Sequence, residues 1–268
     1  MFSNTDCSDL HRPGVRCVQC VRHLLSSHDG LHSVLLRRRF CGFRLSGGGG
    51  EERDLNPAGP TDWRPVGGRI MDKVRRILVY VCKDRAAPQR AQFVQSITSH
   101  FTDGSDDEVE VSCSLDKNQF VLYRGDEGPR IPLKRPAFFP IKHLSVTEAA
   151  AIPLDIQKRG VDVGVALLLQ TTNQRVLLTR RAKELRIFPN VWVPPGGHLE
   201  SDETLLEAGL RELKEETGLK LEPEDVSPKV LGLWESVFPP MLSRGLPQRH
   251  HVVVYMLLHS SSHTCSYR

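Results

Sequence analysis

The sequence contains no long apolar run and no secretory signal peptide. No hydrophobic stretch approaches the roughly 20 residues that a transmembrane helix needs, so we expect no membrane span. The seven cysteines are scattered and odd in number, which is typical of reduced thiols in a cytoplasmic protein. Cys17 and Cys20 form a CxxC pair, but no second pair or nearby HxxxH completes a zinc site.

A strong charge of either sign is also absent. The net charge of +4 and the pI near 8.7 are compatible with a polyanionic substrate, but they are too mild to indicate nucleic-acid binding by themselves. We therefore expect no DNA partner, and the sequence leaves the oligomeric state open. The length of 268 residues and the hydrophobic content of 39% suit a globular protein of one or two domains.

Three acidic residues recur at helical spacing near the end of the chain. Glu212 and Glu216 lie four residues apart, so they share one face of a helix, and Glu215 flanks them. Carboxylates crowded on one face repel one another unless a cation is bound there. Oxygen ligands favour a hard ion such as Mg²⁺ or Mn²⁺. The alternative is a solvated acidic face, which is the commoner origin of this pattern.

The flanking residues favour the metal site over the solvated face. A leucine stripe predicts that the helix packs on a core, and it consists of Leu206, Leu210 and Leu213. Residues 194–197, PPGG, form a rigid turn followed by two glycines that let backbone approach an ion closely. We expect Ser201 to cap the helix and Gly218 to end it.

Taken together, the spacing of these residues resembles the Nudix box: Gly197, five residues, Glu203, seven residues, then RELKEETGL over 211–219. Membership of the Nudix family implies an α/β fold, an α/β/α sandwich with a mixed sheet. It also implies a loop, helix, loop unit that holds divalent metal against a diphosphate. The activity it implies is hydrolysis of a nucleoside diphosphate linked to another group, X.

The flanks look closest to one branch of that family, nucleoside diphosphate-linked moiety X motif seventeen. The segments that carry this resemblance are VDVGVALLLQ, VLLTRRAKELRIFPNVWVPPGGHLE and LGLWESVFPPMLSRGLPQRHHVVVYMLL. Together with the net positive charge of the chain, this resemblance implies the methylated 5′ cap of messenger RNA as the substrate and methylated guanosine diphosphate as the product. A small nucleoside diphosphate derivative is the enzymatic alternative, and a catalytically impaired nucleotide-binding or regulatory form is the alternative from another class.

The predicted site residues have separate roles. Glu212 and Glu216 are expected to be the primary metal ligands, and Glu215 is either a further ligand or the base that orients the attacking water. The resemblance adds the Gly196 carbonyl as a plausible ligand. Arg211 is expected to position and neutralise the carboxylates. We count Glu215, Glu212 and Arg211 as the catalytic set, and Glu203 as support for the loop.

Basic residues that follow a predicted strand are candidates for substrate binding. Arg180 and Arg181 either hold phosphate bidentately or are surface arginines, and Lys183 and Arg186 add positive charge nearby. Trp192 is expected to pack in the core rather than stack on a base.

Residues near the last two predicted strands are further candidates. Glu235 is a possible additional acidic ligand or base, and the loop after it is long enough to form a substrate wall. His250 and His251 are expected to be strand-end residues, one pointing inward and one outward.

The chain divides into three parts by composition. Residues 1–70 combine arginines, a glycine run and prolines without periodicity, so we expect a disordered extension, with mitochondrial targeting as the minor alternative. Residues 71–145 read as a small α/β region with a strand over 77–81, a helix over 86–100 and a hairpin of 109–113 with 120–123. Residues 155–268 read as the Nudix domain, with strands over 161–169, 175–178, 230–234 and 252–258. We expect this domain to be C-terminally truncated, because the family's closing strand and helix are not recognisable.

Overall fold

The computed structural model describes residues 15–19 and 76–260, apart from 84–85, 103–105, 125–127, 171–174 and 186–187. The strands are β1 (Val15–Gln19), β2 (Leu78–Cys82), β3 (Gln89–Arg90), β4 (Glu108–Asp116), β5 (Gln119–Tyr123), β6 (Ile131–Lys134), β7 (Asp162–Gln170), β8 (Arg175–Arg180), β9 (Trp192–Val193), β10 (Gly196–His198), β11 (Val226–Phe238) and β12 (Arg249–Ser260). The α-helices are α2 (Ile97–Phe101), α3 (Val146–Ala151), α4 (Leu154–Gln157) and α5 (Leu205–Thr217), and the 3-10 turns are η2 (Pro140–His143), η3 (Pro223–Asp225) and η4 (Leu242–Arg244).

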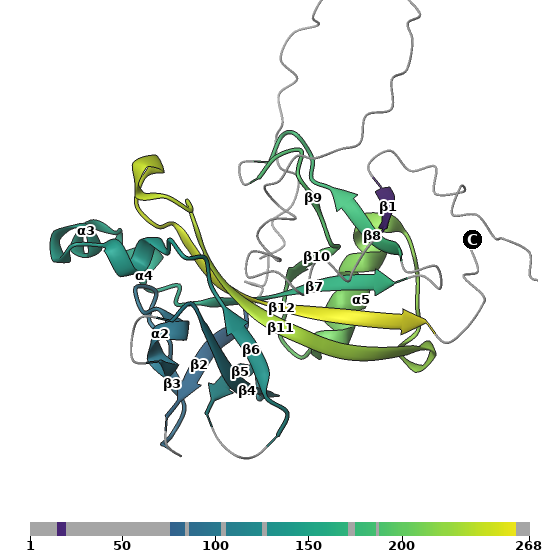
Figure 1. The fold of residues 1–268 in the computed structure, drawn as a ribbon, viewed down its shortest axis with the longest axis horizontal. Coiled ribbons are helices and arrows are strands. Elements are labelled where there is room, and N and C mark those ends of the chain that lie inside the picture. Colours follow the sequence, from purple (N-terminus) through teal and green to yellow (C-terminus); the bar gives the residue numbers. More distant parts are fainter. Residues whose placement is uncertain are drawn as a thin grey trace, which may run out of the picture.

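Within the described residues, all the strands belong to one mixed sheet (Figure 1). Its order is β1-β8-β7-β12-β11-β6-β4-β5-β2-β3, with β10 paired to β7 and β9 to β8. The sheet closes on itself because β2 also pairs with β7, through Leu78 and Asp162. Two hydrogen bonds reinforce this closure: Val79 N–H donates to the Val161 carbonyl at 2.9 Å, and Val163 N–H donates to the Ile77 carbonyl at 3.2 Å.

The largest of the hydrophobic core clusters in the described residues joins this closed part of the sheet to helix α5. Its buried residues run from Ile77 near the start of the described chain to Leu258 near its end. The predicted division into a region over 71–145 and a domain over 155–268 stays a prediction, and both parts contribute strands to the sheet and side chains to this core. In the described part of the chain, none of the helices combines the length and the apolar character that crossing a bilayer requires.

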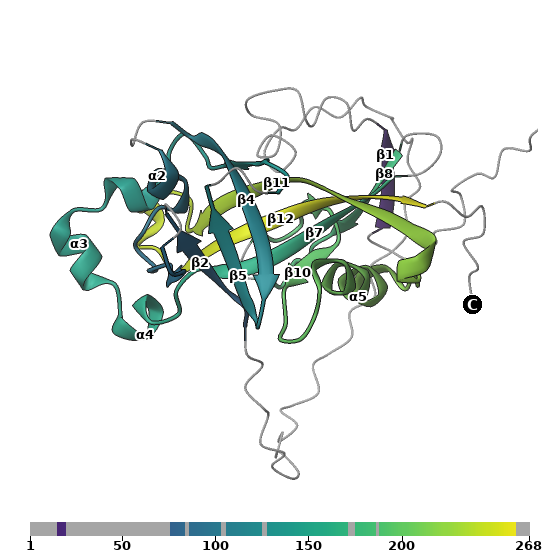
Figure 2. The same ribbon diagram turned by 90° about the horizontal axis from the view of Figure 1, so that it is seen from below.

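Strand β7 is the central strand that the apolar run predicts, and it is buried from Asp162 to Leu169. Helix α5 packs across its inner face and lies beside β10 (Figure 2). The approach is close, because a Cβ at Gly209 would lie 2.9 Å from Cδ1 of Leu167. The predicted strands over 175–178, 230–234 and 252–258 are confirmed as parts of β8, β11 and β12.

The early part of the chain confirms some predictions and corrects one. The strand over 77–81 is confirmed as β2, and the predicted hairpin is formed by β4 and β5 around the left-handed residues Lys117 and Asn118. The helix predicted over 86–100 is wrong. Pro88 cannot continue a helix, the chain forms β3 beside β2 instead, and Ser96 caps the much shorter α2.

Strand β1 was not predicted. It pairs antiparallel with β8, with Val15 opposite Thr179 and Gln19 opposite Arg175. Apart from β1, the extension expected to be disordered over 1–70 lies outside the described residues.

Candidate active site

Helix α5 carries the acidic residues and begins three residues later than predicted. Ser201 is not its cap; Thr204 is, and its hydroxyl accepts from the Glu207 N–H while the Glu207 carboxylate accepts from the Thr204 N–H. The reason is a turn before the helix, in which Asp202 adopts φ 65° and its N–H donates to Asn118 Oδ1 at 2.8 Å. The predicted C-cap is confirmed, because Gly218 is left-handed with φ 80°.

Two glycines bring the β10 backbone directly against α5. A Cβ added at Gly197 would overlap the carboxyl group of Glu212, and one added at Gly196 would overlap the Val165 carbonyl on β7. A side chain at Gly196 would displace the backbone of β7, and a side chain at Gly197 would force the Glu212 carboxyl to move. The PPGG turn therefore places backbone beside the acidic face, as the sequence predicts.

Glu216 is held at the junction of α5, β8 and β10. The Thr179 hydroxyl donates to Glu216 Oε2 at 2.7 Å, and the residue retains an exposed edge. Desolvation by the surrounding protein raises the pKa of Glu216, and the negative charge of Glu212 adds to the rise. Hydrogen bonds from Thr179 and the Gly196 backbone, and the positive charge of Arg181, act in the opposite direction. Sequence reasoning missed Thr179, because only the packing of β8 against α5 brings the two residues together.

Arg211 links the loop to the helix. Its Nε donates to Glu203 Oε1 at 2.6 Å, and its Nη2 donates to Glu203 Oε2 at 3.0 Å and to the His198 carbonyl at 3.1 Å. Its Nη1 donates to Glu212 Oε1 at 2.9 Å. The hydrogen bonds with Glu203 raise the pKa of Arg211 above its usual range and lower the pKa of the Glu203 carboxyl. Glu215 is the outermost acid, 59% exposed and 3.7 Å from Arg211 Nη1.

The carboxylates form a donor set suited to a hard cation. Glu212 and Glu216 converge from one helix face, and the β10 backbone lies beside them. In the described residues, no group of three or more His, Cys, Asp or Glu side chains is already gathered on one point. A cation here would therefore draw its ligands from two side chains and from backbone oxygen, with Glu215 able to swing in from solvent.

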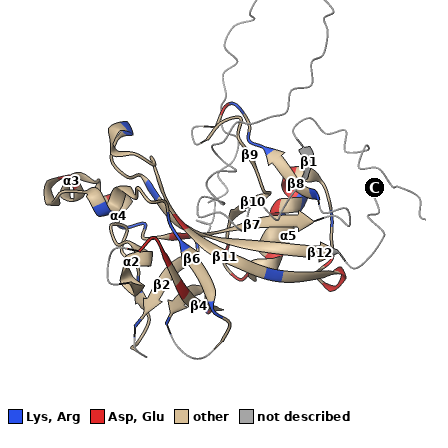
Figure 3. Ribbon diagram, viewed as in Figure 1, with Lys and Arg blue, Asp and Glu red and all other residues tan. Residues whose placement is uncertain are grey.

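The predicted substrate arginines leave the sheet at the end of β8 (Figure 3). Arg181 acts electrostatically on Glu216, so it lies toward the acidic helix. Arg180 is exposed and alternates with Thr179, which places it on the opposite face of the strand. Trp192 is half-buried against the core cluster that contains Leu178, so the prediction that it packs in the core is confirmed.

Glu235 is not near the acidic helix, which corrects its interpretation as a ligand or base. It is 0% exposed and accepts hydrogen bonds from the backbone of Ile97 at 2.6 Å and of Thr98 at 2.8 Å, at the start of α2. His250 is 1% exposed; its Nε2 lies 3.1 Å from Glu235 Oε1, and its Nδ1 lies 2.7 Å from the Phe93 carbonyl. Both ring nitrogens of His250 therefore face oxygen atoms.

His251 points to the other face of β12, and it is also enclosed. Burial, followed by the positive charges of neighbouring His250, His198 and Arg249, lowers the pKa of His251 to about 3. The two histidines point to opposite faces of β12, as predicted, and His251 is partly buried on its face, with Nδ1 enclosed.

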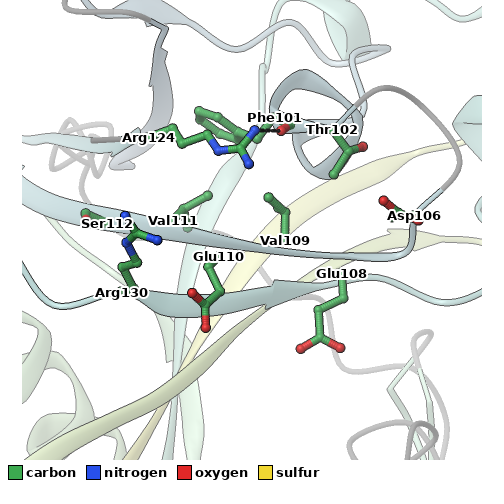
Figure 4. Close-up of a pocket in the computed structure, with 10 residues that line it drawn as sticks. All are labelled: Phe101, Thr102, Asp106, Glu108, Val109, Glu110, Val111, Ser112, Arg124 and Arg130. Atoms are coloured by element: carbon green, nitrogen blue, oxygen red, sulfur yellow. Dashed lines mark hydrogen bonds between the residues drawn. The ribbon is translucent and has the colours of Figure 1, made fainter. Parts of the chain in front are cut away.

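A polar pocket lies away from the acidic helix, on the side of the sheet formed by α2 and β4 (Figure 4). Its volume is about 640 Å³, and its lining includes Glu108, Glu110, Arg124 and Arg130. Arg124 Nη1 donates to the Phe101 carbonyl at 3.0 Å, which ties one wall together. No predicted site residue lines this pocket, so it is separate from the candidate active site.

The chain is similar to known proteins over the part that carries the site. Residues 158–264 match the NUDIX domain. The m7GpppN-mRNA hydrolase NUDT17 of Danio rerio is 61% identical over 193 residues, and that of Xenopus laevis is 55% identical over 195 residues. Each alignment covers 71% of this chain and 64% of the relative, so the chain spans just under two thirds of their length.

Among solved structures, the NUDIX domain of Shewanella oneidensis NrtR complexed with ADP ribose is 24% identical. The alignment covers 46% of this chain and 75% of that one with a TM-score of 0.31, a likeness too weak to support any inference. The box residues, the loop and helix that they form, and the match over residues 158–264 lead to one conclusion: this part of the chain is a NUDIX domain.

Proposed function

We propose that this chain is a metal-dependent hydrolase that cleaves the diphosphate linkage of nucleoside diphosphate derivatives. The observation that carries the proposal is the packing of the Gly196 and Gly197 backbone against the carboxyl groups of Glu212 and Glu216. Such packing brings two carboxylates together beside backbone polar groups, and carboxylate oxygens suit a divalent ion that must also bind phosphate oxygens.

Nudix hydrolases generally need divalent metal ions. We propose Mg²⁺ or Mn²⁺ here, with Glu212 and Glu216 as primary ligands and the Gly196 carbonyl as a further one. Bound at this place, the ion supplies positive charge to the phosphate oxygens and lowers the charge at the phosphorus under attack. Glu215 remains either a further ligand or the base that orients the water, and its exposure leaves it able to do either.

The remaining residues of the site hold these groups in position. Arg211 fixes Glu212 through Nη1 and fixes the loop through Glu203, so it acts as a positioning residue. Thr179 fixes one carboxylate oxygen of Glu216. Because the pKa of Glu216 is raised, this carboxyl takes up a proton at a higher pH than an ordinary glutamate would, and ligation is lost with it.

The substrate that we favour is methyl-capped RNA, with methylated guanosine diphosphate as the product. The support is the name m7GpppN-mRNA hydrolase carried by the relatives from Danio rerio and Xenopus laevis, together with the basic residues beside the site. We propose that Arg181 contacts substrate phosphate, because it faces the acidic helix, and that Arg180 extends the basic surface along the strand edge. A small nucleoside diphosphate derivative is the alternative substrate.

The test uses the full chain and RNA labelled in its methylated cap, with Mg²⁺ and then Mn²⁺. We expect release of labelled methylated guanosine diphosphate, and we expect Glu216→Gln to lower kcat by more than about 100-fold, because even groups that only orient ligands cost 10- to 100-fold. Glu222→Gln is the matched control: this glutamate is also exposed, and it pairs with Lys220 outside the box. Titration with Mn²⁺ should show binding to the wild type and to the control, and weaker binding to Glu216→Gln.

The outcomes separate the parts of the proposal. Release from small nucleoside diphosphates but not from capped RNA would move the substrate assignment to the alternative. A folded wild type that binds Mn²⁺ and hydrolyses none of these substrates would refute the hydrolase and leave a binding or regulatory role. Equal activity of wild type and Glu216→Gln would refute the assignment of the metal ligands.

A further inference from the structure

The connection between β8 and β9, residues 181–191, begins and ends inside the candidate active site. At its start Thr179 donates to Glu216, and at its end β9 leads within three residues to Gly196. Two backbone hydrogen bonds close its neck: Arg181 N–H donates to the Val191 carbonyl at 3.0 Å, and Asn190 N–H donates to the Arg181 carbonyl at 3.2 Å. The two ends of this connection therefore lie beside the acidic helix.

Phe188 is an exposed aromatic residue on this connection. Its side chain is 40% exposed, although it contacts Phe238 at the end of β11, with ring centroids 5.7 Å apart and planes at 80°. Phe238 is half-buried and opens the loop between β11 and β12. The two loops thus meet through an edge-to-face aromatic contact, which fixes the orientation of the Phe188 ring and leaves part of it open to solvent.

The backbone at Phe188 is in an unfavourable conformation. Its φ is 48°, in the left-handed region that bulky residues rarely adopt, and Asn190 follows with φ 60°. Asparagine tolerates this region, whereas phenylalanine does so only where the surroundings impose it. Neither the core nor a charge requires phenylalanine at this exposed position. Strain of this kind clusters where a side chain has to be presented to a ligand.

The surroundings of this aromatic pair suit a nucleotide. Arg181 lies toward Glu216, and Lys183 on the same connection is exposed and basic. A ligand with its phosphates at α5 would pass these charges before its base reaches Phe188. Asn190 is hydrogen-bonded to Arg181 at the closed neck, and only two peptide units separate it from Phe188. The Cα atoms of Phe188 and Asn190 therefore lie within about 7 Å of each other, so Phe188 is close to the neck.

We propose that Phe188, braced by Phe238, is the surface on which the purine base of the substrate stacks. The inference rests on the proposed function and adds the position of the base. Stacking tolerates any base, because each has a π face, and a methylated purine that carries positive charge gains further attraction to the aromatic ring. Phe188 therefore contributes to affinity for the base and leaves the hydrolytic step to the residues of α5.

The test compares Phe188→Leu, which removes the ring, with Phe188→Trp, which restores an aromatic surface. Phe138→Leu is the matched control, because Phe138 is 44% exposed but stacks on His143 away from this connection. With capped RNA and the full chain, Phe188→Leu should raise KM about 10-fold with kcat little changed, since stacking a base is worth roughly that factor or more. Phe188→Trp should restore KM, and the control should not change it.

Binding measured without turnover separates this inference from the proposed function. Calorimetric titration with methylated guanosine diphosphate should show about 10-fold weaker binding to Phe188→Leu, whereas inorganic pyrophosphate, which has no base, should bind equally to both. That pattern would support the stacking surface even if no substrate were hydrolysed. The inference is overturned if Phe188→Leu binds the nucleotide like the wild type, if pyrophosphate binding falls equally, or if the wild type binds no nucleotide.

Discussion

Replacing Glu235 by glutamine should destabilise the protein without changing the chemistry of the folded molecules. The Glu235 carboxylate accepts two backbone hydrogen bonds at the start of α2 and a third at 2.7 Å from the Thr98 hydroxyl, and it faces His250. Both side chains of the pair are 0% exposed. Glutamine keeps the shape, but it removes the negative charge and turns one acceptor into a donor that faces donors.

The magnitude follows from the burial. Leaving a buried donor without an acceptor costs about 1–3 kcal/mol for each group, and Glu235→Gln affects more than one of the donors that face this carboxylate. The whole stability of a domain is typically about 5–15 kcal/mol, so the expected loss is a large share of it. The double variant Glu235→Gln with His250→Gln should lose less than the sum of the single losses, because the two side chains contact each other and each single variant already removes that contact.

The dependence of the free energy of unfolding on pH provides a second test of the role of Glu235. Burial alone would raise the pKa of Glu235, but the hydrogen bonds from His250 and Thr98 and the charge of His250 outweigh it and hold the pKa below the usual value of 4.5. For a carboxyl whose folded pKa is lowered, the stabilisation is complete above 4.5 and is lost as the pH falls through the folded pKa. The wild type should lose this contribution on acidification, and Glu235→Gln should lack it throughout.

The assay is urea unfolding followed by far-UV circular dichroism at pH 7.5, with capped-RNA hydrolysis measured below the transition. Glu222→Gln, an exposed glutamate, serves as the control and should unfold like the wild type. The reasoning is refuted if Glu235→Gln unfolds at the wild-type urea concentration. It is also refuted if kcat of the folded variant falls as it should for Glu216→Gln, since Glu235 would then take part in the reaction.

Three further predictions concern the site and its surroundings. Arg211→Lys should lower kcat about 10- to 100-fold in steady-state assays, because lysine cannot reproduce the forked hydrogen bonds to both acidic partners; unchanged kinetics would exclude a positioning role. Gly197→Ala should lower kcat about 100-fold, because the added Cβ displaces the Glu212 carboxyl. The control Gly245→Ala should keep the wild-type kcat, because nothing lies within 4 Å of its added Cβ. Equal kcat values in the two variants would contradict this prediction. His251→Gln should make the free energy of unfolding depend less on pH, because below pH 6.5 the unfolded wild-type chain takes up a proton that the folded histidine, with a pKa of about 3, does not. Between pH 7.0 and pH 5.5, urea unfolding should show the wild type losing about 1 kcal/mol more stability than the variant. Equal losses would contradict this prediction.

The local arrangement of the box could be predicted from the sequence because it depends on short spacings. Residues four apart share a helix face wherever the helix lies, so Glu212 and Glu216 could be paired without a structure, and glycines before a helix indicate close backbone approach. The roles assigned to Glu215, Arg211 and the arginines after β8 stay predictions, because they depend on where the substrate lies.

Only the tertiary structure decided the contacts between residues far apart in the chain. Glu235 meets the start of α2 across 138 residues, and Thr179 meets Glu216 across 37, and no local pattern encodes either separation. Glu235 looked like a site residue because an acid at a strand end is ordinarily exposed; its burial follows from the packing of α2 and His250 against it. The sequence by itself therefore determined which residues are candidates to hold a metal. The tertiary structure determined that Glu235 is buried and that the ring of Phe188 is partly exposed to solvent.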